Sequence, residues 1–241
     1  KALFVGANDG MLHAFDTQTG NELFAYIPRW VVPKLPALTS TSYAHQSYAD
    51  GSPVVADAKV DGNWRTVLVA GTGGGGQGVV ALDVTRPESF DDGSVMWEFT
   101  DRDDPSMGNV IGRPQILKFR QSAPGGTIVY RYYAVVASGV NNQLADGHAS
   151  DGAPVIFLLD LSKAGNEAWV LNTNYFKIEL PLASDAMTIA SGISGFTARL
   201  GYADEVSALY AGDLHGNLWK LDFSKVGADD WNMDDLSYFK N

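Results

Sequence analysis

The sequence predicts an all-β fold in which four-stranded antiparallel sheets repeat along the chain as the blades of a β-propeller. The apolar runs of this 241-residue chain are strand-length, and 26 Gly and 10 Pro residues are scattered between them as turn residues. One unit of four such runs recurs along the chain. Hydrophobic residues make up 45% of the chain, including 6 Trp, 10 Tyr and 11 Phe, so a packed core is expected and disorder is not.

The recurring unit is recognised by its third run, which leads from a turn into an aspartate at residues 9–16, 78–83, 154–160 and 216–222. The run before it ends in small residues, at 3–6, 66–71, 132–139 and 208–212. These two runs together are typical of a β-hairpin. A strand that opens with Gly or Ser precedes three of the hairpins, at 51–56, 112–117 and 194–198. An aromatic-bearing run follows three of them, at 23–26, 95–99 and 168–170. Four antiparallel strands in this order form one propeller blade.

We expect one propeller domain or fragment over residues 1–241, with blades at about 1–27, 51–100, 112–171 and 194–223 onward. The chain starts inside a blade and ends after the third strand of another, near Phe223. About three blades' worth of strands is fewer than the roughly four that closure needs, so a partial or modified propeller is predicted. A β-sandwich has the same alternating strands and is the alternative architecture.

Two loops are interpreted as insertions. The spacing between the aspartates that end the third runs exceeds the ~40–50 residues of a compact blade. The extra length falls in the loops Pro28–Tyr48 and Asn141–Gly152. Because binding residues are found disproportionately on loops, these two segments are candidates for function.

Charge and composition limit the partners. The formal net charge is −11 and the pI is about 4.6, with no stretch rich in Lys or Arg, so no nucleic-acid partner is expected. The chain has no cysteine, which excludes disulfides and thiolate chemistry without fixing the compartment. No apolar run approaches the roughly 18 residues of a membrane span. Lys1 opens directly into a strand-like run with no signal-peptide pattern, which indicates a piece of a longer protein.

The glycine-rich segment Gly71–Gly78 could bring backbone N–H groups close to an anion. A phosphate site also needs a Gly-Lys-Ser/Thr sequence or a strand-to-helix context, and neither follows here. We therefore interpret this segment as a flexible hairpin connection. The histidines lack the i, i+4 spacing of a helical zinc pair, so structural roles are expected for His13, His45, His148 and His215.

Acidic loop residues are the candidates for metal binding. Asp101, Asp103 and Asp104 place carboxylates in one loop, where a hard cation such as calcium could bind, and solvated loop charge is the alternative. The sequence contains no Gly-x-Ser-x-Gly motif and no acid pair that spacing singles out. We therefore predict no catalytic residues and no enzyme activity.

The segment Ala14–Phe24 resembles the blade-docking repeat of quinoprotein dehydrogenases, with Phe24 where a Trp is usual. In that repeat the aromatic ring packs on the neighbouring blade. The resemblance therefore implies quinoprotein-like blades and does not imply redox chemistry.

Several motifs together carry a wider resemblance. Val5–Asp16 reads Val-Gly-Ala-Asn-Asp-Gly-Met-Leu-His-Ala-Phe-Asp. The run Thr66–Gly71 leads into the glycine-rich segment and then into Ala81–Val84. Tyr210–Asp222 reads Tyr-Ala-Gly-Asp-Leu-His-Gly-Asn-Leu-Trp-Lys-Leu-Asp. In this order and spacing the motifs resemble the propeller domain of the PilC/PilY family of type IV pilus biogenesis factors, over most of the chain.

The resemblance implies an exported, non-enzymatic module that supports type IV pilus assembly, controls retraction and, in some members, mediates adhesion to host cells. Its partners would be pilus subunits or minor pilins and a host-surface receptor. Its location would be extracellular or at the cell surface, at the pilus tip or outer membrane, after export through the periplasm. The alternatives are a quinone-dependent dehydrogenase propeller and a periplasmic outer-membrane assembly scaffold.

Members of this family often carry a calcium loop of the form Asp-x-Asp-x-Asp-x-x-x-Asp directly before the Tyr-Ala-Gly-Asp strand. Here that place is Arg199–Ser207, and Asp204 and Glu205 are its only carboxylates. Calcium takes some 6–8 oxygen ligands, so we expect the family's site to be degenerate. No cofactor is predicted, and calcium at this loop or at Asp101–Asp104 is the alternative.

Overall fold

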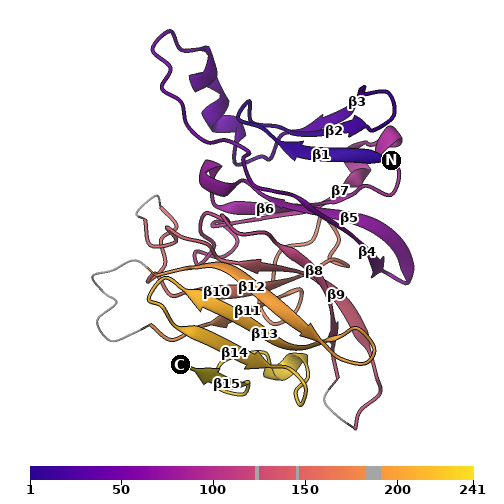
Figure 1. Cartoon of the computed structure of the whole chain (residues 1–241), viewed down its shortest axis with the longest axis vertical. Coiled ribbons are helices and arrows are strands. Elements are labelled where there is room, and N and C mark those ends of the chain that lie inside the picture. The colour runs from indigo at the N-terminus through magenta and orange to yellow at the C-terminus, as the bar shows by residue number, and fades with distance from the viewer. Residues whose placement is uncertain (123–124, 145–146, 183–190) are drawn as a thin grey trace.

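The computed structural model describes residues 1–122, 125–144, 147–182 and 191–241 of a chain that folds into four successive antiparallel sheets (Figure 1). The first sheet contains β1 (Ala2–Gly6), β2 (Leu12–Asp16) and β3 (Glu22–Tyr26). The second contains β4 (Val54–Val60), β5 (Asn63–Gly71), β6 (Gly78–Asp83) and β7 (Val95–Thr100). The third contains β8 (Gln115–Arg120), β9 (Tyr130–Ala137), β10 (Val155–Asp160) and β11 (Tyr175–Glu179). The fourth contains β12 (Ile193–Leu200), β13 (Val206–Asp213), β14 (Leu218–Asp222) and β15 (Ser237–Lys240).

Within every sheet the strands pair in sequence order, as in propeller blades, so the all-β prediction and the four-stranded blade are confirmed. Helical structure in the described residues is limited to short 3-10 segments at η1 (Val32–Thr39), η2 (Gly73–Gly75), η3 (Pro87–Ser89), η4 (Asp92–Ser94) and η6 (Ala228–Asp230). None of these helices has the length and apolar character needed to cross a bilayer.

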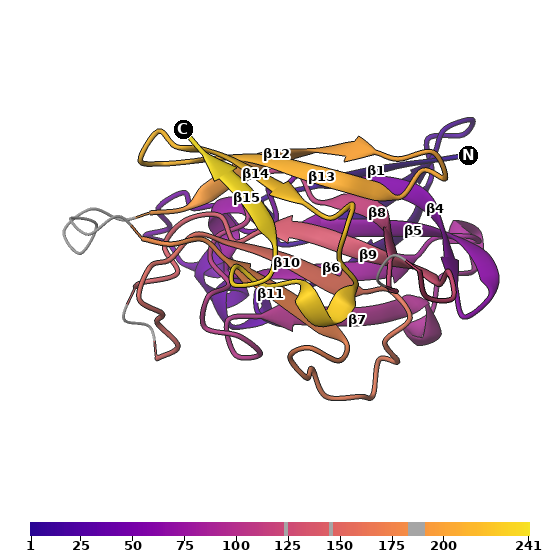
Figure 2. The same cartoon turned by 90° about the horizontal axis from the view of Figure 1, so that it is seen from below.

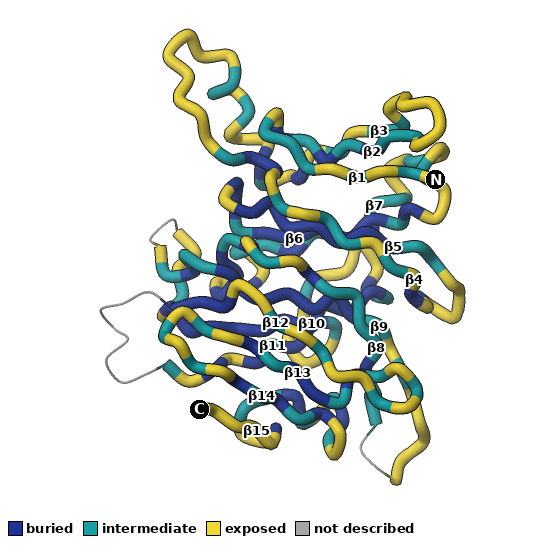
Figure 3. Tube along the Cα trace, in the orientation of Figure 1, coloured by how far each residue is buried: buried dark blue, intermediate teal, exposed yellow. Residues whose placement is uncertain are grey.

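The third strands of the second and third sheets are buried along nearly their whole length because these two sheets have a core on both faces. All six residues of β10 are buried, as are five of the six in β6 (Figure 3). Such continuous runs occur where a sheet is packed on both sides, whereas alternation marks a strand with one solvated face. β14 shows the alternating pattern, since Trp219 and Leu221 are buried and Leu218 is exposed. β14 therefore has a packed face and an exposed face.

Three hydrophobic cores join the four sheets in succession. Leu12 and Phe4 of the first sheet pack with Leu68 and Leu82 of the second. A second core joins the second and third sheets and includes Val67, Phe99, Phe157 and Tyr175. A third joins the third and fourth sheets and includes Phe119, Ile178, Trp219 and Trp231. The sheets therefore stack like successive blades, and Figure 2 shows the stack from the end at which β15 forms the outer edge.

The docking repeat lies at a blade boundary. Phe24 of β3 stacks on Phe90 with ring centroids 3.8 Å apart and an interplanar angle of 11°. Phe90 belongs to the connection between β6 and β7 of the second sheet. The aromatic ring thus packs on the neighbouring blade, which is the role that the resemblance implied.

Two strand predictions were wrong. The predicted third blade ended at residue 171 with 168–170 as its outer strand, but the outer strand is β11 at Tyr175–Glu179. Trp169 lies instead in a loop whose indole N–H donates to the Glu98 carbonyl of the second sheet at 2.7 Å. The fourth blade does not end after three strands near Phe223, because β15 pairs with β14 as a fourth strand. Between them Trp231 enters the third core, which brings the chain back to the sheet edge.

Candidate functional site

A cleft of about 1130 Å³ lies beside the second and third sheets. It brings together segments that the sequence had marked separately. Its lining includes residues of the first insertion, of the second, of the glycine-rich segment and of the acidic segment after β7: Arg29, Trp30, Pro33, Lys34, His148, Gly74, Gly76, Gln77 and Asp101 to Asp103. The outer strand β7 and the loop Lys163–Trp169 complete the wall.

The glycine-rich segment is packed tightly against the first insertion. A Cβ on Gly75 would lie 1.6 Å from the Tyr48 carbonyl oxygen, so only glycine fits there. The Trp30 ring covers Gly78 so closely that an added Cβ would lie 2.8 Å from the indole. The Trp30 N–H donates to the Thr72 hydroxyl at 3.0 Å. The segment connects β5 and β6 as predicted, but it is closely packed where a flexible connection was expected, and its glycines allow the close backbone approach that forms one side of the cleft.

The opposite wall is built from indole rings and a buried amine. Trp97 of β7 is buried, and its ring meets that of Trp169 edge to face with centroids 5.2 Å apart. Lys163 places its ammonium 4.5 Å from the centre of the Trp169 ring and donates to the Ala164 carbonyl at 2.9 Å. Burial lowers the pKa of Lys163. The cation–π contact and the hydrogen bond fix the position of this amine at the wall.

Glu98 ties the first insertion to this wall. Its carboxylate accepts a hydrogen bond from the Tyr26 hydroxyl at 2.5 Å and another from the Arg29 backbone N–H at 2.9 Å. Burial, with the nearby Glu98 carboxylate, raises the pKa of Tyr26. Tyr26 therefore stays a neutral donor at physiological pH and holds the loop that follows β3 over the cleft.

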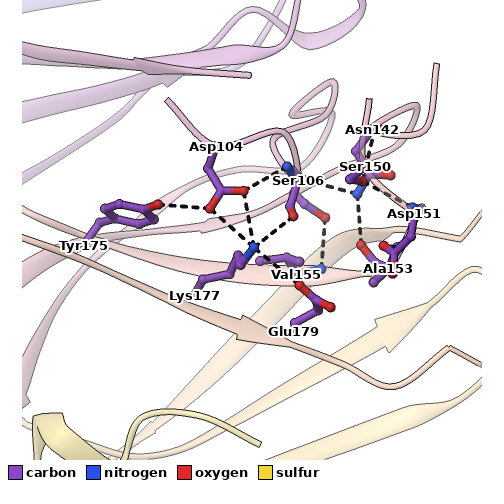
Figure 4. A network of polar contacts seen from close by, with 12 residues as sticks. Asp104, Ser106, Asn142, Ser150, Asp151, Ala153, Val155, Tyr175, Lys177 and Glu179 are labelled. Atoms are coloured by element: carbon purple, nitrogen blue, oxygen red, sulfur yellow. Dashed lines mark hydrogen bonds and ion pairs between the residues drawn. The ribbon is translucent and has the colours of Figure 1, made fainter. Parts of the chain in front are cut away.

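The acidic segment after β7 is divided between the cleft and the interior. Asp101 and Asp103 line the cleft, and Asp103 accepts hydrogen bonds from the Thr100 backbone N–H and hydroxyl at 2.9 and 3.1 Å. Asp104 is only 4% exposed, and its carboxylate is directed toward Tyr175 and Lys177 (Figure 4). It accepts from the Tyr175 hydroxyl at 3.1 Å and pairs with the Lys177 ammonium at 3.4 Å. The ammonium of Lys177 thus already neutralises the buried carboxylate.

The other two candidate ligands lie in a different blade. Asp204 and Glu205 occupy the turn between β12 and β13, where Asp204 has a φ of 58°. Glu205 accepts a hydrogen bond from the Ala203 N–H at 2.9 Å. The structure therefore does not bring these two carboxylates together with the Asp101–Asp104 segment. Within residues 1–122, 125–144, 147–182 and 191–241, no three His, Asp or Glu side chains form a group that could hold a metal ion.

The histidines lie at four separate places. His13 lies between two carboxylates, 2.6 Å from Glu22 and 2.9 Å from Asp9. The hydrogen bond to Glu22, and to a smaller extent that to Asp9, raises the pKa of the His13 imidazole. His45 packs edge to face on Tyr43. His148 lines the cleft and His215 is partly buried in the turn before β14.

Sequence reasoning missed the residues that build the cleft wall, above all Trp30, Glu98, Lys163 and Trp169. One signal was available. Trp30 is a large aromatic residue inside a predicted insertion and outside every strand-like run, which is an unusual place for an indole with only a packing role. Glu98 and Lys163 carried no comparable signal, because their partners come from other blades.

Four stacked antiparallel sheets joined by cores between neighbours define part of a β-propeller, and the cleft lies beside two of these sheets. Comparison with known proteins agrees. Residues 1–237 match the family model of the PilY1 beta-propeller domain. The chain therefore belongs to the PilY1 propeller family.

The chain is 36% identical over 238 residues to a type IV pilus biogenesis factor PilY1 homolog of Xylella fastidiosa, covering 96% of this chain and 14% of the relative. It is 38% identical over 230 residues to type IV pilus biogenesis factor PilY1 of Pseudomonas aeruginosa strain UCBPP-PA14, covering 91% of this chain and 17% of the relative. The crystal structure of the Pseudomonas aeruginosa PilY1 C-terminal domain superposes with a TM-score of 0.68 at 31% identity, covering 95% of this chain and 40% of that one. The chain thus spans less than a fifth of these two sequence relatives.

Proposed function

We propose that this chain is the propeller part of a type IV pilus biogenesis factor and that it works without catalysis, through protein contacts. The observation that carries the proposal is the family match over residues 1–237, supported by relatives that are themselves type IV pilus biogenesis factors. Its role is to support pilus assembly against retraction and to mediate adhesion. Its partners are pilus subunits or minor pilins and a receptor on the host surface.

The chemistry of the cleft supports binding. The Glu98 carboxylate accepts hydrogen bonds from Tyr26 and Arg29, and Asp103 is engaged by the Thr100 backbone. Carboxylates held in this way organise loops and are not positioned as an acid and base pair across a reacting bond. A rigid set of loops around a cleft is the usual arrangement for recognition.

We place the full-length protein at the cell surface or the pilus tip, reached by export through the periplasm. The test is to shear pili from cells of the natural host and probe the sheared fraction with an antibody against this chain. The protein is expected in that fraction, and deleting the gene for the major pilin should remove it from there. A protein that stays with the cell pellet in both strains would contradict a role on the pilus.

Cross-linking tests the partners within the same fraction. A photoreactive amino acid introduced at exposed Arg102 should yield adducts with a pilus subunit or a minor pilin, identified by mass spectrometry. The same group at exposed Glu88, which lies outside the cleft, is the control for nonspecific capture. Equal adducts from both positions would mean that the cleft does not face the pilus.

A further inference from the structure

The cleft has three properties that together select a class of ligand, and the first is size. Its volume of about 1130 Å³ exceeds the roughly 300–1,000 Å³ of sites for drug-sized molecules. The cleft can therefore hold an oligomeric ligand. It is bounded by β7 of the second sheet and by loops that follow or connect strands of the first three sheets.

The second property is that the exposed edge of β7 is closed to strand addition. The Glu98 carbonyl accepts the Trp169 N–H at 2.7 Å, so one backbone acceptor of this edge is occupied. The loop lies so close to the edge that a Cβ on Gly165 would be 2.9 Å from the Met96 carbonyl oxygen. An extended peptide binds a sheet edge through free main-chain groups, and these contacts block that mode. A ligand in the cleft is therefore recognised by contacts other than strand addition to β7.

The third property is a nearly balanced set of donors and acceptors. The lining carries five carboxylates, those of Asp92, Glu98, Asp101, Asp103 and Glu167. It also carries four cationic side chains, those of Arg29, Lys34, Arg102 and Lys163. Such a lining has no excess charge to attract a polyanion. It suits a ligand whose groups both donate and accept hydrogen bonds, as hydroxyl groups do.

Two half-buried indoles add rigid surface to this polar lining, although the Lys163 ammonium lies over the ring of one of them, Trp169. Trp30 is held by its hydrogen bond to Thr72, and Trp169 is held by its hydrogen bond to Glu98. Rings fixed in this way offer flat apolar area at little cost in side-chain entropy. Sugar rings present C–H groups on their faces and hydroxyls on their edges, and they therefore match flat indoles surrounded by polar groups.

We propose that the cleft binds an uncharged oligosaccharide, with Trp30 packing on a sugar ring and the charged side chains at the rim binding hydroxyls. Glu167 and Arg102 are two of the exposed charged residues of this lining. The proposal does not depend on the role in pilus assembly, because binding can be measured on the isolated chain. If the oligosaccharide proposal fails, the proposed role in pilus assembly is unaffected, and the reverse also holds.

The test titrates the 241-residue chain with cellohexaose, chitohexaose and isomaltohexaose, followed by calorimetry and tryptophan fluorescence. At least one is expected to bind with a Kd below about 1 mM. The double variant Glu167→Gln with Arg102→Gln should weaken that binding by about tenfold or more. Glu88→Gln, an equally exposed change outside the cleft, should leave it unchanged, and circular dichroism should show that both proteins keep the parental fold.

Three results would overturn the proposal. The first is that none of the three oligosaccharides binds below about 1 mM. The second is that binding occurs but is the same in the double variant, which would place it outside the cleft. The third is that a heparin hexasaccharide or a pool of random 12-residue peptides binds instead and is lost in the double variant, which would assign the cleft to an anionic or a peptide ligand.

Discussion

Replacing Trp219 with alanine tests the packing of the blades most sharply. The side chain is 1% exposed and lies in the core between the third and fourth sheets. Its indole N–H donates to the Asp213 carboxylate at 2.8 Å, and its ring lies 6.0 Å from that of Tyr238. Truncating a buried Trp typically costs about 3–5 kcal/mol, because apolar contacts are lost and a cavity is left. The Asn217 amide, 2.7 Å from the same carboxylate, still satisfies that acceptor, so packing dominates the loss.

The measurement is urea unfolding followed by circular dichroism. With a slope of about 2–3 kcal/mol/M, a loss of about 3–5 kcal/mol moves the midpoint down by about 1–2.5 M. The matched control is Leu218→Ala, one residue earlier in β14 and on its exposed face, which should cost well under about 1 kcal/mol. Equal midpoints for the two variants would refute the assignment of faces and with it the stacking of the sheets. His215, in the turn before β14, is partly buried and serves less well as a control.

Three further predictions concern the glycine-rich segment, pH and metal. Gly75→Ala should lower the melting temperature markedly, since the added Cβ would lie 1.6 Å from the Tyr48 carbonyl oxygen. Gly74→Ala is the control and should change the melting temperature little, because the nearest atom to its Cβ would be 3.2 Å away. Similar losses in the two variants would show that the segment is not close-packed. Hydrogen bonding to Glu22 raises the pKa of His13, so protonated His13 should stabilise the fold fully below about pH 6, and this contribution should be lost as the pH rises through the raised pKa. The denaturant midpoint of His13→Gln should lack this pH dependence. EDTA should leave the melting temperature unchanged, and a fall of more than a few degrees would indicate a bound cation instead.

Much of the fold was predictable because local sequence patterns mark most strands of each blade. In the second blade the expected runs at 51–56, 66–71, 78–83 and 95–99 correspond to β4, β5, β6 and β7. Strand-length apolar segments between turn residues suffice there, since every strand contributes to a core on at least one face.

The missed strands lacked that local signal. All four residues of β15 are exposed, so no burial pattern marks it. Ala168–Val170 carries a stronger aromatic signal than its surroundings. Trp169, however, donates a hydrogen bond to the Glu98 carbonyl, 71 residues earlier in the sequence, and the outer strand β11 follows this loop. A contact over that separation leaves no trace in a local pattern.

The site was predictable only in pieces. The two insertions and the acidic segment were recognised as loops with chemical potential, but their meeting in one cleft depends on how successive blades stack. Asp104 illustrates the limit. Its partners Tyr175 and Lys177 come from β11, and nothing in the spacing of these residues shows that one aspartate of the segment is buried while Asp101 and Asp103 face the cleft.

The most direct test of the proposed role is complementation of a pilus defect. In Pseudomonas aeruginosa lacking its own PilY1, a chimera would carry residues 1–237 of this chain in place of the matching propeller segment, and surface pilin in sheared fractions would be compared with that of cells expressing the intact relative. The account predicts surface pilin at about the level given by the relative, and a loss of it when the chimera carries Trp219→Ala. Surface pilin as low as in the deletion strain, from a chimera present at the relative's level by immunoblot, would contradict it.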